Sequence, residues 1–233
     1  MSTRTADSVT RISFVVPGGE LRFADGDLDN WAEHLAWCYR LLGIAPGATI
    51  AVQDYGTSPL AYLGSALLMP TLEAGIAERL DAQLICLDAS VERVLLTPDV
   101  IRQIDPDVLI VRAEVLGLLL EVARRAGSDL TAFPGLTIVA AIGAQPVPLP
   151  PGSWPRLLHV ESSLLLAPEC AHCGCFHLRG GVYSRADGRI ENLLQGSAVA
   201  CELSRLHVVD DVCGLGAGDL LFRLVDPGEA GRP

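Results

Sequence analysis

The chain has 233 residues and half of them are hydrophobic, which is enough apolar material for one large domain, or a domain with a small satellite, to bury a core. Its formal charge is −11 at pH 7. A protein that neutralises the phosphates of DNA or RNA needs the opposite sign, so we expect no nucleic-acid partner. All 17 basic residues are arginine, which excludes any mechanism that needs a lysine amine from this chain acting alone.

The N-terminal segment MSTRTADSVTR is polar and lacks the apolar core of a secretory signal, so we expect a cytoplasmic protein. The uncharged stretch 55–72 contains two prolines and two glycines, which indicates a buried helix rather than a membrane span. We therefore expect no membrane partner. Seven cysteines in a cytoplasmic chain indicate free thiols or metal ligands rather than a disulfide framework.

From residue 27 onward, helix-like and strand-like patterns alternate. Asp27 can cap a helix in which Trp31, Leu35, Cys38 and Leu42 recur at spacings of three and four. The next expected elements are a strand at 49–52, a helix at 61–74, a strand at 83–87, a helix at 99–104, a strand at 108–111, a helix at 114–126 and a strand at 136–142. Such alternation predicts an α/β fold, a mainly parallel sheet with flanking helices.

Ligands of parallel sheets bind at the carboxyl ends of the strands, so the loop Gly143, Ala144, Gln145 and Pro146 is a candidate binding position. Beyond the proline-rich segment 147–155, shorter strand-like pieces at 157–160, 189–193, 198–203, 206–209 and 220–225 predict a smaller β-rich subdomain. The expected organisation is an N-terminal arm at 1–20, an α/β core at 21–155, a β-rich metal-binding subdomain at 156–228 and a tail at 229–233.

The stretch ECAHCGCFHL places three cysteines and two histidines within ten residues. Thiolates and imidazoles are the ligands that zinc prefers, so Cys170, Cys173, Cys175 and His177 are the predicted metal ligands and zinc the predicted cofactor. Four ligands from eight consecutive residues make a sterically tight shell. Cys201 or Cys213 is therefore an alternative source of the fourth ligand.

Two other interpretations of this stretch stay open. The cysteines can be reduced, partly buried thiols near a turn. Alternatively, Cys173 or Cys175 beside His172 can form a catalytic thiolate pair. If metal binds, a closed four-ligand site is structural, whereas an open site leaves room for a water of lowered pKa and for hydrolytic or lyase chemistry.

Several segments resemble phenylacetate-CoA ligases, members of the adenylate-forming superfamily, over roughly residues 20–230. The segment LRFADGDLDNWAEHLAWCYRLLGIAPGATIAVQDYG is similar to the part that follows their phosphate-binding loop. The segments SPLAYLGSALL, DVLIVRAEVLGLLLEVARRAG, GAQP, ECAHCGCFHL and GAGDLLFRLVDP follow in the family's order. The resemblance implies the large N-terminal domain of such a ligase, with Cys170 and His177 on family positions and Asp219 on the aspartate that holds the ribose hydroxyls.

The departures from this family are equally informative. The segment RISFVVPGGELRF stands where the family has a phosphate-binding loop ending in lysine, and it contains no lysine. Gln145 replaces the glutamate of Gly-Ala-Glu-Pro, and LLHVES retains only Glu161 of a further motif. The chain ends at Pro233, before the small domain that carries the second lysine in the family. Adenylation needs these cations to neutralise the transferring phosphoryl group, so we expect neither ATP as cofactor nor acyl-adenylate formation.

These observations predict a truncated, degenerate ligase relative that binds a small carboxylic acid, an acyl thioester or a nucleotide in a biosynthetic pathway. One alternative is a metal- or cysteine-dependent acyl transferase, hydrolase or lyase, with Glu161, Cys173, Cys175 and His172 as candidate catalytic residues. Another is one subunit of a split ligase, whose partner supplies the phosphate loop and the lysine. We also expect a homodimer, because loss of the C-terminal domain would expose an apolar face.

Overall fold

A six-stranded sheet forms the centre of the computed structural model, which describes residues 12–16, 19–24, 26–143, 145, 147–186, 189–194, 197–198, 206–209, 213, 215 and 219–224. The strand order is β4-β3-β5-β6-β7-β8. The strands are β3 (Thr49–Gln53), β4 (Gln83–Leu87), β5 (Val108–Arg112), β6 (Thr137–Ile142), β7 (Arg156–Val160) and β8 (Leu165–Pro168). The first five run parallel and β8 pairs antiparallel with β7, so the predicted α/β class with a mainly parallel sheet is confirmed.

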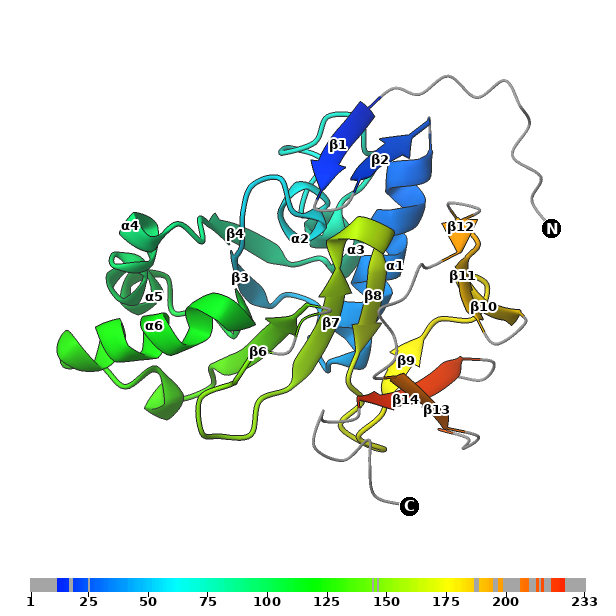
Figure 1. Cartoon of the computed structure of the whole chain (residues 1–233). Helices are drawn as coiled ribbons and strands as arrows, with labels where there is room; N and C mark the ends of the chain where they lie inside the picture. The colour runs from blue at the N-terminus through cyan, green and yellow to red at the C-terminus, as the bar shows by residue number, and fades with distance from the viewer. Residues whose placement is uncertain are drawn as a thin grey trace, which may run out of the picture.

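Helices cover both faces of this sheet (Figure 1). One face carries α1 (Asp27–Leu41), α2 (Pro59–Tyr62) and α3 (Ile76–Leu80), and the other carries α4 (Val91–Val94), α5 (Thr97–Ile104) and α6 (Ala113–Arg125). Successive strand residues alternate between the two cores: Ile110 is buried on the α1 side, whereas Leu109 and Val111 are buried on the α6 side. Burial on both faces accounts for the mainly apolar sequences of the central strands β3, β5 and β6.

An antiparallel hairpin, β1 (Ile12–Val16) and β2 (Gly19–Phe23), lies against the α1 side of the molecule. Phe23 is buried in the core there, and the ring of Phe14 stacks on that of Tyr62 with a centroid separation of 4.1 Å. Part of the predicted arm 1–20 is therefore a strand pair anchored to the core.

Two small antiparallel sheets follow β8. One contains β13 (Leu206–Val209), β14 (Leu220–Leu224) and β9 (Phe176–Leu178) in that order, and the other contains β10 (Tyr183–Ala186), β11 (Arg189–Asn192) and β12 (Ser197–Ala198). Because β7 and β8 pair into the main sheet, that sheet crosses the boundary predicted between 155 and 156. The smaller β-rich part begins after Pro168. Most of the strand predicted at 198–203 and the tail 229–233 lie outside the described residues.

The long helix predicted over 61–74 is wrong. Between β3 and Ile76 only α2 is helical, and turns and irregular backbone occupy the segment between α2 and α3, which includes Pro70. Proline cannot continue a helix, and the chain folds back so closely that a Cβ on Gly75 would lie 2.5 Å from the Cα of Ser65. Asp27 is the first residue of α1 rather than its cap, a position that Gly26 takes, and its carboxylate accepts the Ala24 amide at 2.7 Å. Among the described helices, none has the length and apolar character needed to cross a membrane.

Candidate functional site

Four potential metal ligands from two distant parts of the chain meet at the edge of the small β9 sheet. Cys170 and Cys173 come from the loop that leads into β9, His177 lies in β9, and Cys213 precedes β14. Their ligand atoms all lie within 4.8 Å of one another, and all but Cys173 are buried. The structure thus brings together three of the four predicted ligands with Cys213. The other residue considered as a fourth ligand, Cys201, lies outside the described residues.

Backbone hydrogen bonds in the loop bring the cysteines together. The Cys170 amide donates to the Cys175 carbonyl at 2.8 Å, and the Gly174 amide donates to the Cys170 carbonyl at 2.8 Å. Gly174 has φ +66°, in the left-handed region that glycine adopts without strain. The loop therefore returns on itself, and β9 then pairs with β14, with His177 opposite Leu221. This pairing places Cys213, which precedes β14, close to the loop.

The distances suit a tetrahedral shell. With Zn–S bonds of about 2.3 Å and Zn–N bonds of about 2.0 to 2.1 Å, a tetrahedral ion separates two sulfurs by about 3.8 Å and a sulfur from a nitrogen by about 3.5 Å. Cys170 Sγ and Cys213 Sγ lie 3.9 Å apart, and Cys173 Sγ and His177 Nε2 lie 3.5 Å apart. Three sulfurs and one imidazole nitrogen are also a donor set that zinc accepts, so the residues fit this ion.

Asp219 lies directly behind His177. Its Oδ2 is 3.1 Å from Nδ1 of His177, and its Oδ1 accepts the Gly180 amide at 3.0 Å. A carboxylate accepts from a protonated Nδ1, which leaves the Nε2 lone pair directed at the cysteines. The residue that the resemblance assigns to a ribose thus has both oxygens engaged within the chain, one of them orienting a candidate metal ligand.

Two other residues of the predicted site lie outside this four-residue group. Cys175 is buried, but its thiol lies 3.6 Å from the Cys173 carbonyl and it does not belong to the group whose ligand atoms gather. His172 is exposed, and the imidazole beside Cys173 is that of His177. The predicted ligand set therefore changes in one member, with Cys213 in place of Cys175.

Electrostatics within the group favour a cation. Burial raises the pKa of Cys170, but hydrogen bonds from the backbone amides of Cys173 and His172 outweigh it, so the pKa lies below its usual value. Burial raises the pKa of Cys173 to about 12, and the neighbouring Cys213 and Cys170 act in the same direction. One thiolate is thus stabilised, while a second is costly unless a bound cation offsets its charge.

A second polar group, which we call the sheet-end cluster, consists of Asp54, Arg112, Glu161, His159 and Tyr62. Arg112 ends β5, Asp54 follows β3 and Glu161 follows β7, all at the carboxyl edge of the sheet. The Arg112 Nη1 donates to Asp54 Oδ1 at 3.0 Å and to Glu161 Oε1 at 2.6 Å. Burial alone would lower the pKa of Arg112, but these two carboxylates outweigh it and raise the pKa.

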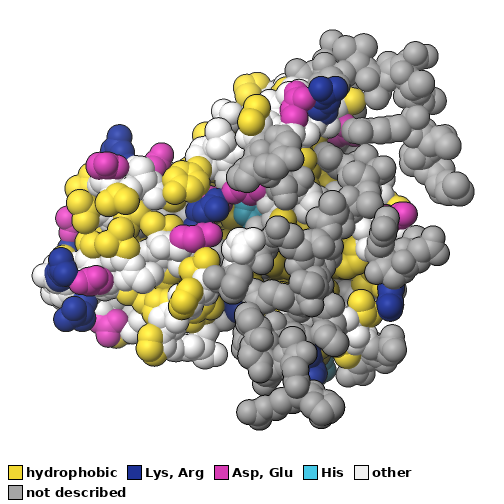
Figure 2. Space-filling model, viewed as in Figure 1, with side chains coloured by type: hydrophobic (Ala, Val, Ile, Leu, Met, Phe, Trp, Pro, Cys, Tyr) yellow, Lys and Arg dark blue, Asp and Glu magenta, His cyan; other side chains and the backbone are white. Residues whose placement is uncertain are grey.

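His159 and Tyr62 complete the cluster as buried groups with unused polar atoms. Each residue is only 6% exposed, and neither His159 Nε2 nor the Tyr62 hydroxyl has a hydrogen-bond partner within the described chain. Burial lowers the pKa of His159, although the carboxylates of Asp54 and Glu161 act to raise it. Burial, together with Glu161, raises the pKa of Tyr62. Figure 2 shows an arginine with acidic neighbours and a histidine near the middle of the visible face.

Glu161 is the one member of the sheet-end cluster that the sequence singled out. Asp54 and Arg112 could have been found from their places at strand ends: Arg112 directly follows the predicted strand at 108–111, and Asp54 lies one residue beyond the position that follows the strand at 49–52. The sequence carries no such signal for His159 and Tyr62. In the predicted loop, Gly143 follows β6 and Gln145 is exposed, while Ala144 and Pro146 lie outside the described residues.

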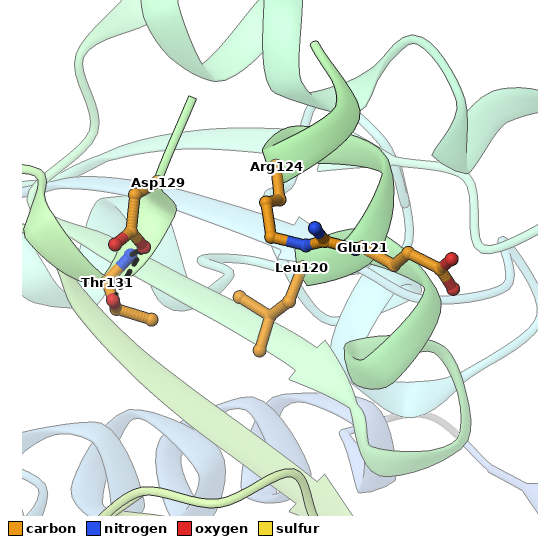
Figure 3. A pocket seen from close by; sticks show the side chains of 5 residues that line it. All are labelled: Leu120, Glu121, Arg124, Asp129 and Thr131. Atoms are coloured by element: carbon orange, nitrogen blue, oxygen red, sulfur yellow. Dashed lines mark hydrogen bonds between the residues drawn. The ribbon is translucent and has the colours of Figure 1, made fainter. Parts of the chain in front are cut away.

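A surface hollow near the end of α6 has no comparable chemistry (Figure 3). It is lined by Leu120, Glu121, Arg124, Asp129 and Thr131. Asp129 accepts from the amide and hydroxyl of Thr131 at 3.0 and 2.6 Å and thereby begins the short 3-10 turn Leu130–Ala132. Asp129 and Thr131 therefore serve the local turn, and Glu121 pairs with Arg125 on the same helix.

No family model and no curated protein matches the chain. Among the solved structures that resemble it is 2-hydroxyisobutyryl-CoA ligase in an open conformation with 2-HIB-AMP and CoA. That match has a TM-score of 0.47 and 18% identity, over 59% of this chain and 28% of that chain. The same ligase in the postadenylation state with R3-HIB-AMP matches with a TM-score of 0.44 and 18% identity, over 57% of this chain and 27% of that chain. The chain thus spans less than a third of the ligase, and a likeness of this size establishes neither a family nor an activity.

Proposed function

We propose that the chain is a zinc-stabilised α/β binding protein that holds a small acyl ligand, a carboxylic acid or an acyl thioester, without converting it to an acyl-adenylate. The observation that carries the proposal is the contact of 3.1 Å between Asp219 and His177. In this contact Asp219 orients His177, a candidate metal ligand. The resemblance assigns Asp219 to the ribose of a nucleotide, and here its carboxylate is already engaged by His177.

Two features argue against adenylation by this chain. It contains no lysine, so neither of the cations that the resembled family uses on the phosphates is supplied here. Arg112, which ends β5 at the carboxyl edge of the sheet, already pairs its guanidinium with Asp54 and Glu161. A nucleoside triphosphate carries negative charge and would be repelled by the carboxylates at this edge, which favours an acyl group over a nucleotide as ligand.

Cys170, Cys173, His177 and Cys213 would hold the metal, and a bound zinc ion would supply structural cross-linking rather than an activated water. A hydrolytic zinc site has three protein ligands and keeps its fourth position open for water. Four protein ligands within 4.8 Å of one another fill the shell, which disfavours the alternative of metal-dependent hydrolysis or elimination. The homodimer and the partner ligase subunit stay predictions.

Native mass spectrometry of protein purified without added metal, with elemental analysis of the same sample, tests the metal centre. We expect one zinc ion per chain. Exchange of labelled pyrophosphate into ATP in the presence of mixed carboxylic acids tests the absence of adenylation, and we expect none. A chain without metal would overturn the zinc-stabilised scaffold, and measurable exchange would overturn the claim that the ligand is not activated.

A further inference from the structure

The sheet-end cluster carries more negative than positive charge. Arg112 contributes the one guanidinium, with Nη1 on Asp54 and Glu161 and Nε at 3.6 Å from Glu114 Oε2. The two carboxylates and one guanidinium of the cluster leave a formal charge of −1, and the neighbouring Glu114 adds a further negative charge. The side chains of Arg112 and Glu161 are 22% and 21% exposed, so a ligand can reach these two members of the cluster from solvent. Its charge selects against a carboxylate or a phosphate and in favour of a cation.

The carboxylates of the cluster differ in how far their oxygens are already used. Asp54 accepts from the Tyr55 amide at 2.7 Å and from Arg112 on one oxygen, and from the Ser58 hydroxyl at 2.6 Å on the other. Among the described contacts, Glu161 accepts only from the Arg112 Nη1 that also serves Asp54. Asp54 is therefore occupied in holding the start of α2, and Glu161 has acceptor capacity left.

His159 and Tyr62 lie on the same side of the sheet as Arg112. Arg112 is level with Ala141 on β6, and Ala141 is level with Leu157 on β7. His159 follows Leu157 by two residues, so it projects from the face that carries Arg112, and Tyr62 is buried in the core on that face. The Nε2 of a neutral imidazole accepts when the proton is on Nδ1, and a phenol oxygen can accept, so each of these two buried atoms can accept a hydrogen bond that no described group donates.

A metal ion does not explain this arrangement. Within the part of the chain that the structure describes, the cysteine group is the one set of three or more such side chains close enough to share an ion, and Asp54, His159 and Glu161 do not form another. An organic cation fits better. The ring of Tyr55 already receives the Arg112 guanidinium at 5.0 Å, which shows that an aromatic face at this edge favours positive charge.

We propose that the ligand of the sheet-end cluster carries a primary ammonium group whose N–H bonds go to Glu161 and to the unpartnered His159 and Tyr62. An ammonium offers three donors and no acceptor, which matches a site with unused acceptors and excess negative charge. This inference rests on the proposed acyl-binding function, and it narrows the ligand class from a carboxylic acid or an acyl thioester to an acyl thioester that bears an amine, because the cluster disfavours a free carboxylate.

Three N-acetylcysteamine thioesters of similar size test the inference by calorimetric titration: 3-aminopropanoyl, butanoyl and 3-carboxypropanoyl. They place an ammonium, a methyl group and a carboxylate at comparable positions. We expect the 3-aminopropanoyl thioester to bind roughly tenfold or more tightly than the butanoyl one, because a hydrogen bond to a charged group is strong, and the 3-carboxypropanoyl one to bind most weakly. The preference should disappear in Glu161→Gln and persist in Glu121→Gln, a surface carboxylate on α6.

The possible results separate the two proposals. If butanoyl binds as well as 3-aminopropanoyl, the amine inference is overturned while acyl binding stands. If none of the three binds, acyl binding fails and the amine inference fails with it. If the amine preference survives in Glu161→Gln, with the melting temperature unchanged, the ammonium is not received by the sheet-end cluster. A shift of the His159 imidazole nitrogen resonance on adding the 3-aminopropanoyl thioester, absent with butanoyl, would place the amine at this residue.

Discussion

The candidate metal centre and the sheet-end cluster are both polar groups assembled from distant segments, but they differ in how completely their polar atoms are used. At the metal centre the second nitrogen of His177 is engaged by Asp219, and the other oxygen of Asp219 by Gly180. At the sheet end His159 Nε2 and the Tyr62 hydroxyl have no partner in the described chain. A group whose atoms serve one another suits a structural role, whereas one with unused buried acceptors suits an external ligand.

The candidate metal centre and the sheet-end cluster also differ in the size of the hydrophobic core beside them. The sheet-end cluster borders a large hydrophobic core that spans the main sheet, α1 and the β1 hairpin. Among the described residues, the apolar cluster at the metal centre has four buried members, Cys170, Cys175, Cys213 and Leu221. So small a cluster provides little hydrophobic stabilisation for the cysteine loop, whereas Phe176, Leu178 and Phe222 of β9 and β14 pack in the large core. We therefore expect the cysteine loop and the parts of β9 and β14 beside it to depend on metal, and the main sheet to be independent of it.

The sharpest test compares two buried cysteines, and it carries the largest expected effect. Cys213→Ser should abolish metal binding and remove more than about 5 kcal/mol of metal-linked stability from the small β-sheet, because a structural site binds its ion strongly only with all four ligands. Cys175→Ser should retain the metal, since this thiol lies outside the four-residue group. Elemental analysis of both variants and hydrogen exchange of β9 and β14 amides give the readout.

The opposite result, metal lost from Cys175→Ser and kept by Cys213→Ser, would restore the ligand set expected from the sequence. Treating the wild-type protein with a chelator separates the two regions further. Amides of β9 and β14 should lose protection, while those of β3 and β5 should keep theirs. Equal loss in both sheets would contradict the idea that only the small sheet depends on metal.

The second largest effect concerns the pairing of Arg112. The Asp54 side chain is 1% exposed, so Arg112→Met leaves a buried carboxylate without its cation. We expect a loss of about 3 kcal/mol in the free energy of unfolding. Arg125→Met removes a surface ion pair with Glu121, whose partners are 72% and 45% exposed, and should cost less than about 1 kcal/mol. Equal urea midpoints for the two variants would argue that Arg112 does not stabilise the sheet end.

A third and smaller effect should come from the support of His177 by Asp219. Asp219→Asn retains the shape of the side chain but removes the charge that holds the Nδ1 proton. A supporting carboxylate of this kind contributes about 10- to 100-fold in metal affinity, and we expect a loss in this range. Competition with a chromophoric chelator measures it, with the exposed Asp99→Asn as control. An unchanged affinity would leave Asp219 without a role at the metal centre.

The sequence predicted the sheet well because its strands are short apolar runs bounded by clear turn signals, as at β3 and β5. It failed over 61–74, where apolar residues at helical spacing concealed the break at Pro70 and the close approach at Gly75. The local spacing also predicted that the cysteine loop gathers potential metal ligands, and the structure brings three of the predicted residues together. That Cys213 rather than Cys175 joins this group follows from the pairing of β9 with β14, a contact across more than 40 positions that no local pattern encodes.

His34 isolates the effect of burial from that of either cluster, and it provides the smallest of the expected effects. It is fully buried in α1, its Nε2 donates to the Leu166 carbonyl at 3.1 Å, and burial lowers its pKa to about 3.

The unfolded chain, in which His34 has an ordinary histidine pKa of about 6.5, binds more protons than the folded chain below that pH. Stability should therefore fall by about 2 kcal/mol for this group between pH 7 and pH 5. Loss of metal on acidification affects wild type and His34→Gln alike, so the difference between their urea unfolding curves at the two pH values isolates His34. If the free energy of unfolding changed equally with pH in the wild type and in His34→Gln, His34 would not be held neutral by burial.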